Sequence, residues 1–201
     1  MNGHSRRIRA VFDDETITVY QAYAAPIAHA ALAAGRFVPP FGRDRMTWIK
    51  PSFLWMMYRS GWGTKPDQEH VLAVEITRAG FEWALAHSCA SHYDRDRYAS
   101  ERDWRQALRA SPVRVQWDPE RSVDLKPLPH RSLQVGLSGP AVASYVDEWT
   151  VGITEVTGTA HAVRDALRAG DRDRATALLP PERTYPLPAE VAAVVGADLP
   201  G

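Results

Sequence analysis

Short segments rich in β-branched and aromatic residues recur along the chain and restrict the folds open to it. Such composition is typical of β-strands. It predicts strands at residues 16–23, 46–49, 71–77, 113–117, 132–137 and 151–156. Helices are predicted at residues 26–34, 52–60, 81–88 and 140–149, around Trp104, and as a pair over 159–179. Because strands and helices do not alternate regularly, we expect an α+β fold with a curved or split mixed sheet and flanking helices.

The length and composition are those of a globular protein with one main domain. The 201 residues are 45% hydrophobic and 24% charged, with 24 basic and 24 acidic residues. Such a chain is long enough to bury a full core. Proline becomes frequent after residue 179. We therefore expect a single α+β domain over residues 1–179 and a Pro-rich C-terminal tail over residues 180–201.

The sequence disfavours a membrane or secreted protein. The Ala-rich run at residues 26–34 is short and is interrupted by His29, and residues 1–15 lack the apolar stretch of a signal peptide. The one cysteine, Cys89, can form no disulfide within the chain. We expect a cytoplasmic protein without a membrane partner.

Residues 35–65 concentrate positive charge among aromatic side chains. One acidic residue stands against six basic ones, which are Arg36, Arg43, Arg45, Lys50, Arg59 and Lys65. Because cations hold phosphates and aromatic faces stack on bases, this composition suits a nucleotide, a dinucleotide cofactor or a nucleic-acid strand. The alternative is structural, since residues 53–58 would give a helix a buried stripe that arginine stems commonly cover.

Several common enzyme motifs are missing from the sequence. It contains no GxxxxGK[ST] and no GxGxxG after a strand, so neither a phosphate loop nor a Rossmann turn is supported. It also contains no nucleophile elbow. His87, Cys89 and His92 lie close together, but no second cluster offers a fourth metal ligand. Packing roles are therefore favoured for them, and no metal is expected.

Two predicted strands carry a polar face. Side chains alternate along a strand, so Arg114, Gln116 and Asp118 share one face and the apolar residues between them share the other. Ser132 and Gln134 share a polar face in the same way. This pattern suits a core on one side and a cleft on the other. The alternative is an ordinary half-solvated strand.

Four long motifs resemble a bacterial and fungal family of unknown function, number 4291. They are RxxxDDETITVYQAY, GRFVPPFGRDRMTWIKPSFLWMMYRSGW, PVRVQWDPER and RSLQVGLSG. The resemblance covers about residues 7 to 180 and is specific because the motifs are long. It implies membership of that family but no settled activity.

The order of elements is also similar to the ADP-ribosyltransferase fold, in its diphtheria-toxin-like branch. There, a first strand carries a His that holds a ribose. A later strand carries a Tyr that stacks on nicotinamide and leads into a Ser-led helix, and a late strand bears the catalytic Glu. By this resemblance Gln21 stands at the His position, Trp48 at the Tyr position and Gln134 at the Glu position, with Ser52 leading the helix. NAD is the cofactor that the resemblance implies.

The predicted function is that of an NAD- or nucleotide-binding, ADP-ribosyltransferase-like protein that modifies nucleic acid. Arg9, Lys50 and Arg59 are expected to meet phosphates. Because Gln134 carries no charge to stabilise an oxocarbenium-like centre, the negative charge must come from another carboxylate. The candidates by strand position are Glu75, Asp118 and Glu120. Glu75 is also expected to be buried beside an arginine.

Two other functions remain open on the sequence. One is a non-catalytic nucleic-acid-binding module that uses the basic and aromatic residues of 36–65. The other is a structural or partner-binding domain whose tryptophans belong to the core. Exposure of Trp48 separates the structural domain from the other two, and release of nicotinamide separates the transferase from the binding module.

Overall fold

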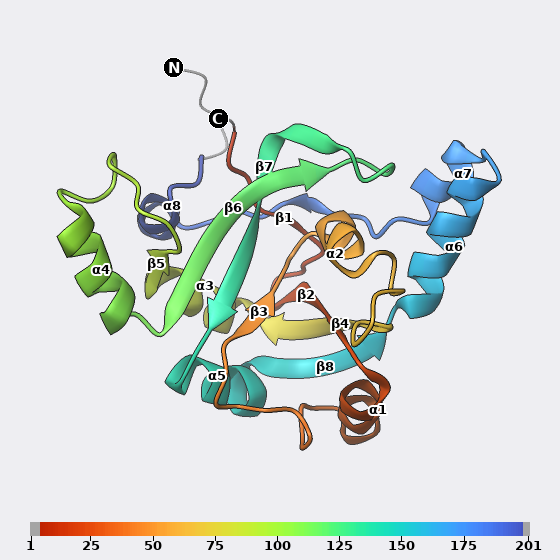
Figure 1. The fold of residues 1–201 in the computed structure, drawn as a ribbon, viewed down its shortest axis with the longest axis horizontal. Coiled ribbons are helices and arrows are strands. Elements are labelled where there is room, and N and C mark those ends of the chain that lie inside the picture. The colour runs from red at the N-terminus through yellow and green to blue at the C-terminus, as the bar shows by residue number, and fades with distance from the viewer. Residues whose placement is uncertain (1–4, 199–201) are drawn as a thin grey trace.

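The computed structural model describes residues 5–198, and the strands in this range form three sheets in a mixed α+β fold (Figure 1). The first sheet has the order β2 (Thr16–Tyr23), β4 (His70–Thr77), β8 (Thr150–Glu155). The second has the order β3 (Thr47–Ile49), β7 (Pro127–Leu137), β6 (Val113–Arg121), β5 (Ser88–Ala90). The third pairs β1 (Arg9–Ala10) with β9 (Arg183–Thr184). Neighbouring strands are antiparallel except β5 and β6. The predicted α+β class is confirmed.

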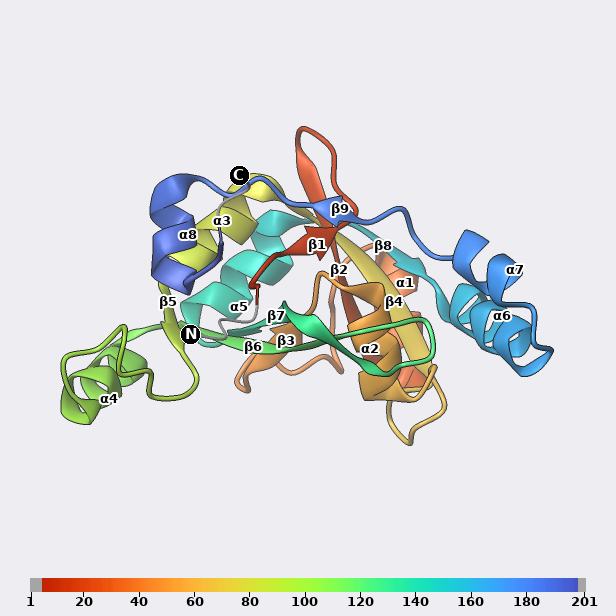
Figure 2. The same ribbon diagram turned by 90° about the horizontal axis from the view of Figure 1, so that it is seen from above.

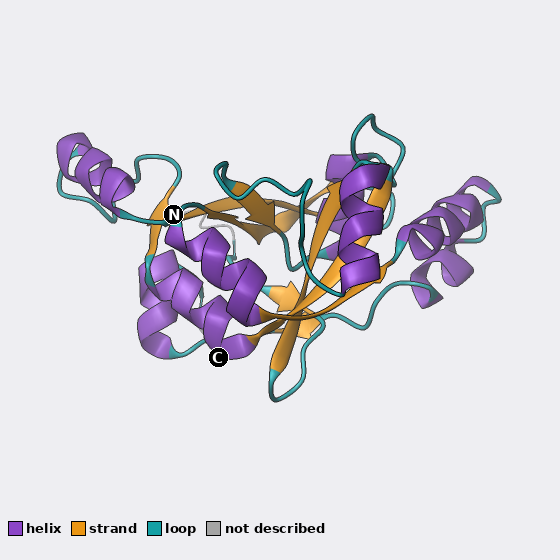
Figure 3. Ribbon diagram, turned by 90° about the horizontal axis from the view of Figure 1, so that it is seen from below, coloured by secondary structure: helices purple, strands orange, loops and turns teal. Residues whose placement is uncertain are grey.

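Helices lie on both sides of the strands and at both ends of the molecule (Figure 3). They are α1 (Ala25–Ala34), α2 (Phe53–Ser60), α3 (Arg78–Ala86), α4 (Glu101–Ala110), α5 (Pro140–Ser144), the π-helix η1 (Tyr145–Trp149), α6 (Thr157–Arg168), α7 (Arg172–Ala177) and α8 (Ala189–Val195). Helix α4 lies at one end, and α6 with α7 lies at the other (Figure 2). Within residues 5–198 these helices are too short or too polar to cross a bilayer.

The two larger sheets meet where β2 runs beside the residue that follows β3. The amide of Tyr20 donates to the carbonyl of Lys50 at 2.7 Å, and the amide of Lys50 donates back to Tyr20 at 3.3 Å. Through this pair of bonds, the residue that follows β3 connects the edges of both sheets. The two bonds fix the backbone of Lys50 between them.

Alternation along the strands assigns one face of each large sheet to the main core. Ile17 and Val19 of β2 and Val113 and Val115 of β6 are fully or almost fully buried in one cluster with residues of α3, η1 and α8. The opposite face of β2 and β4 packs against α2 and α6 in a second cluster. The opposite face of β6 and β7 carries polar side chains, as the alternation predicts.

Strand β6 is longer than predicted. The predicted strand ends at residue 117, but the observed strand continues to Arg121 with an irregular register between Pro119 and Arg121. An irregularity of this kind accommodates a proline, because the missing N–H then falls at an interrupted position of the ladder. The hairpin turn comes after Arg121, where the amide of Ser122 donates to the carbonyl of Lys126 at 2.9 Å.

The segment after residue 179, predicted as a separate tail, completes the core within the described range. Strand β9 pairs with β1, and Tyr185 is buried between Phe12 and Phe81. Helix α8 contributes Val191 and Val195 to the main cluster. Short strands and a seven-residue helix among prolines carry little periodic signal, which is why the sequence did not indicate them.

Candidate functional site

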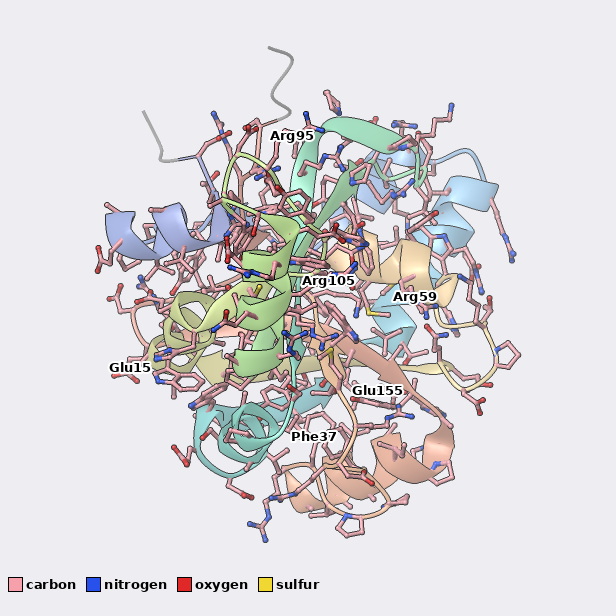
Figure 4. The ribbon with its side chains drawn as sticks, turned by 60° about the vertical axis from the view of Figure 1, so that its left-hand side comes forward. Glu15, Phe37, Arg59, Arg95, Arg105 and Glu155 are labelled. Atoms are coloured by element: carbon pink, nitrogen blue, oxygen red, sulfur yellow. The ribbon has the colours of Figure 1, made fainter. Side chains whose placement is uncertain are left out.

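A cavity of about 730 Å³ lies between the edges of the two large sheets and the helix α2. It is lined by residues of β2, of β3 and its flanks, of α2, of the loop 66–68 and of β6 and β7. Three side chains that the sequence places in one cleft, Gln21, Trp48 and Gln134, all line it. Lys50 and Arg59 line the same space, so the structure brings together five of the predicted site residues. Arg59 projects from α2 (Figure 4).

Lys50 is the most unusual side chain of the cavity. It is 6% exposed, and its Nζ donates to the carbonyl of Trp48 at 3.3 Å and lies 5.4 Å from the ring centre of Trp55. Within residues 5–198 it forms no ion pair. Burial, reinforced by the charge of Arg59, lowers the pKa of Lys50 to about 7, while Asp118 acts in the opposite direction. The ammonium therefore has unused donors beside the cavity.

Gln116 of β6 and Gln134 of β7 form the polar wall of the cavity, and both bond Asp118, which does not itself line the cavity. The amide Nε2 of Gln116 donates to Asp118 at 2.9 Å, and that of Gln134 donates to the other oxygen of Asp118 at 2.8 Å. Gln116 and Gln134 are direct partners across the two strands. Their amide oxygens have no hydrogen-bond partner in the described part of the chain, so each remains available as an acceptor at the cavity.

The indole of Trp48 lies across β7 because the residue paired with Trp48 on that strand is a glycine. Trp48 is paired with Gly136, and a Cβ added at Gly136 would lie 3.0 Å from the indole and 2.8 Å from Sδ of Met46. Any larger residue at 136 would push the indole away from the sheet. Trp48 is half-buried, so part of its face is accessible from the cavity.

Gln21 lines the cavity but its amide is already occupied by the protein. Its Nε2 lies 2.8 Å from both the hydroxyl of Tyr23 and that of Thr47, and its Oε1 accepts from Tyr145 at 2.7 Å. Nε2 is also 3.2 Å from the carbonyl of Trp48. A side chain 3% exposed and bonded on both sides holds β2, β3 and η1 together. It shapes the wall of the cavity and offers little to a ligand.

The charges that line the cavity are mainly positive. Arg45, Lys50 and Arg59 stand against one acid, Asp67. Arg59 is exposed and donates to Gln68 at 3.4 Å. Two of the other basic residues of 36–65 have partners elsewhere, since Arg43 bonds Asp147 at 2.6 and 2.8 Å and Lys65 bonds the carbonyl of Arg59 in α2. Residues that face the cavity and residues that are paired elsewhere have the same charge in the sequence, so composition does not separate them.

A comparison with known protein families identifies the chain. Residues 7–185 match the family described as "Domain of unknown function (DUF4291)". The chain belongs to this family. No curated protein matches it, and nothing in the comparisons supports the resemblance to the ADP-ribosyltransferases.

The matched span of the DUF4291 family includes every residue that lines the cavity and extends to Tyr185. It thus includes a second group of predicted site residues, which lies under the first turn of α2. Ser52 caps that helix by accepting from the amide of Trp55 at 3.1 Å, and it donates to Glu120 at 2.9 Å. Ser52 and Glu120 are 1% and 5% exposed. They are therefore packed behind the cavity and do not line it.

Glu182 belongs to the same group and was not predicted as a site residue. Its Oε1 accepts from the amide of Phe53 at 2.6 Å. Arg9, predicted to meet a phosphate, donates instead to the backbone carbonyl of Glu182 at 2.7 Å and does not line the cavity. Burial raises the pKa of Glu182 to about 8, the Phe53 amide opposes this rise, and the charge of Glu120 adds to it.

The raised pKa of Glu182 predicts a specific dependence of stability on pH. Folding takes up a proton at Glu182 between about pH 4.5 and pH 8, so this group's contribution to stability falls as pH rises through that window, by up to about 1.4 kcal/mol per pH unit. Glu182→Gln keeps the acceptor for Phe53 and removes the charge. We expect Glu182→Gln to unfold at a higher temperature than the wild type at pH 8.5 and at nearly the same temperature at pH 5.

The measurement is the difference in melting temperature between variant and wild type across this pH range. Taking the difference removes the opposite contribution of Lys50, which both proteins share. Glu190→Gln, which changes an exposed carboxylate of α8, is the matched control and should shift nothing. A difference that stays constant from pH 5 to pH 8.5 would show that the proton is not held at Glu182.

Glu75 does not lie where the sequence predicts. It is exposed and makes no ion pair in the described part of the chain, whereas burial beside an arginine was expected. In the pairing of β2 with β4, Glu75 lies opposite Thr18, and Leu72 lies opposite Gln21. Thr18 and Gln21 are three residues apart, so their side chains lie on opposite faces of the sheet. Glu75 thus projects from the opposite face of the sheet. Its expected burial was wrong because Gly152, its neighbour on β8, leaves that face uncovered.

The segment with two histidines and a cysteine has ordinary contacts. His87 stacks on Trp83 with ring centres 4.1 Å apart, and buried Cys89 lies 3.2 Å from the hydroxyl of Tyr98. Among residues 5–198 no group of three or more His, Cys, Asp or Glu side chains is placed to hold a metal ion. His92 lines a second cavity, which adjoins the first.

Proposed function

We propose that the cavity between the sheets binds a nucleotide, with NAD and ATP as the first candidates. The observation that carries this proposal is Lys50, a buried amine that forms no ion pair within the described residues and is a cation below about pH 7. A buried charge is normally paired. An anionic ligand would supply the missing partner and would receive charge-assisted hydrogen bonds from a group that is already in place.

The other walls supply what the remaining parts of a nucleotide need. Arg45 and Arg59 add positive charge within the same cavity as Lys50, which suits a diphosphate. The partly exposed indole of Trp48 offers a face for stacking. The free amide oxygens of Gln116 and Gln134 are acceptors for ribose hydroxyls or an exocyclic amine.

A transferase that uses NAD is the second candidate, and Asp118 is the observation that favours it. The ADP-ribosyltransferase-like arrangement implied by the sequence needs a carboxylate beside the ribose that becomes positively charged as nicotinamide leaves. Of the three candidates, only Asp118 contacts Gln134, and its two oxygens are fixed by two amides. A carboxylate held in this way is preorganised to stabilise positive charge, and it could also accept the proton of the attacking hydroxyl.

A thermal-shift experiment tests nucleotide binding directly. ATP, NAD and adenosine are each added to the full-length protein. A ligand at 100 times its Kd stabilises by about 2.7 kcal/mol, which raises the melting temperature by about 5–10 °C for a chain of this size. We expect such a shift with ATP or NAD and a much smaller one with adenosine, which lacks phosphate. Equal shifts with all three, or no shift with any, would overturn the proposal.

A further inference from the structure

A second cavity of about 400 Å³ adjoins the first, and Gln116 lines both. It lies at the edge of β6 beyond the end of β5, where the chain leaves the sheet at Ser91 and forms the loop that leads to α4. Helix α2 and this loop lie on opposite sides of β6 and β7 (Figure 1). The two cavities are therefore neighbours on β6, with Gln116 between them.

The second cavity also has a surplus of positive charge. Arg6, Arg95 and Arg97 line it together with one acid, Asp94. Arg6 lies 3.9 Å from Asp94, which neutralises one cation. Arg97 donates to the carbonyl of Val194, a neutral partner that leaves its charge uncompensated. Arg95 is exposed and has neither a hydrogen bond nor an ion pair within the described range; its place in the loop is marked in Figure 4.

Aromatic and unpaired polar groups accompany these cations. Tyr93 is 41% exposed, and its ring centre lies 6.3 Å from that of Trp104, whose Nε1 donates to the carbonyl of Ala90 at 2.8 Å. The Oγ of Ser91 is buried and has no hydrogen-bond partner among residues 5–198. The second cavity thus repeats the features of the first, which are cations, an accessible ring and a polar group without a partner.

We infer that the second cavity binds the next nucleotide of a single-stranded nucleic acid whose first nucleotide occupies the cavity at Lys50. The inference rests on the proposed function. The repetition of the same features on both sides of Gln116 matches a ligand made of repeating units, since a strand presents a phosphate and a base at each step. Three further arginines, Arg102, Arg105 and Arg109, share one face of the neighbouring helix α4; Arg105 pairs with Glu101 at 2.7 Å, and Arg102 and Arg109 are exposed without an ion pair in the described range.

The test compares ligands of increasing length on the full-length protein. The probes are UMP, fluorescein-labelled hexauridylate and fluorescein-labelled hexathymidylate, followed by polarisation and by competition. We expect at least one hexamer to bind about tenfold or more tightly than UMP. The two hexamers distinguish RNA from DNA. Two hexamers that bind no tighter than UMP would overturn the inference while the proposed nucleotide site stands.

A charge reversal then locates the second nucleotide. Arg95→Glu should weaken binding of the preferred hexamer at least tenfold and leave UMP binding within twofold. It should also lower the slope of log affinity against log salt, by about 0.7 for each lost phosphate contact. Arg36→Glu, which reverses an exposed arginine outside both cavities, is the matched control and should change neither.

Three results would count against the inference in different ways. An Arg95→Glu protein that binds the hexamer like the wild type would show that the strand does not pass through the second cavity. An equal loss for UMP and hexamer would show that the loop supports the first cavity only. Absence of binding by UMP, ATP, NAD and both hexamers would instead remove the proposed function itself.

Discussion

The Lys50→Met protein is expected to lose most of its nucleotide affinity and yet to be more stable than the wild type at pH 6. A hydrogen bond to a charged group contributes about 1.5–3 kcal/mol, so loss of the ammonium should weaken binding of ATP or NAD by about 10- to 150-fold. Methionine has a similar volume and carries no charge. Replacing buried charge with well-packed apolar side chains commonly stabilises a protein by about 1–4 kcal/mol.

The pH dependence gives this prediction a second readout. The pKa of Lys50 is lowered to about 7 in the folded protein, from an ordinary value of 10.5. The unfolded chain therefore binds more protons between pH 7 and pH 10.5, and the stability of the wild type should rise with pH across this window. The advantage of Lys50→Met should be largest below pH 7 and should diminish towards pH 10.

Melting curves at pH 6 and pH 9, together with calorimetric titration of ATP, measure both effects. The chain has three lysines, Lys50, Lys65 and Lys126, and Lys126 is exposed in the β6–β7 turn. Lys126→Met is thus a matched control and should leave stability and binding unchanged. If Lys50→Met melted below the wild type at pH 6, Lys50 would have a stabilising partner. If it bound ATP normally, the ligand would bind elsewhere.

The Gly80→Ala protein is expected to be the least stable of the variants considered. Gly80 lies in α3 against the indole of Trp149, and an added Cβ would lie 2.6 Å from Cδ1 of that ring. Trp149 is 8% exposed and also packs against Trp83, so it has little room to move. Overpacking of this kind typically costs about 1–3 kcal/mol. That cost should exceed the gain of up to about 1 kcal/mol that alanine brings to a helix.

Thermal unfolding is the measurement, with an expected fall of about 2–6 °C in melting temperature. Gly158→Ala provides the control, because it makes the same change in α6 where nothing lies within 4 Å of the added Cβ. It should stabilise the protein slightly or leave it unchanged. Equal effects at the two glycines would mean that α3 can shift away from η1 without penalty.

Local patterns predicted the elements that are long or strongly alternating. Strand β2 has the predicted bounds, and Gln116 and Gln134 line the cavity as alternation requires, with Asp118 bonded to both. A strand with a buried face has few ways to orient its side chains, so its sequence carries that information. Trp48 and Lys50 line the same cavity because β3 and the cap of α2 are adjacent in the chain.

Tertiary contacts explain what the sequence did not predict. Whether Gln21 was free or bonded depended on Tyr145, which is 124 residues away. The loss of Arg9 from the site and the addition of Glu182 depended on a contact between the two ends of the described chain. The exposure of Glu75 depended on Gly152 of β8, which is far from Glu75 in the sequence. None of these has a local signature.

The pairing of β1 with β9 determines when this chain can finish folding during its synthesis on the ribosome. The amide at the start of α2 is bonded by Glu182, and Tyr185 fills a gap beside Phe12. A nascent chain that has emerged only as far as β8 would therefore have both large sheets but an open core beside Phe12 and Phe81. The core closes only after about thirty further residues have been synthesised. Until then its apolar surface is exposed, so this is the stage of synthesis at which a chaperone would have the largest surface to bind.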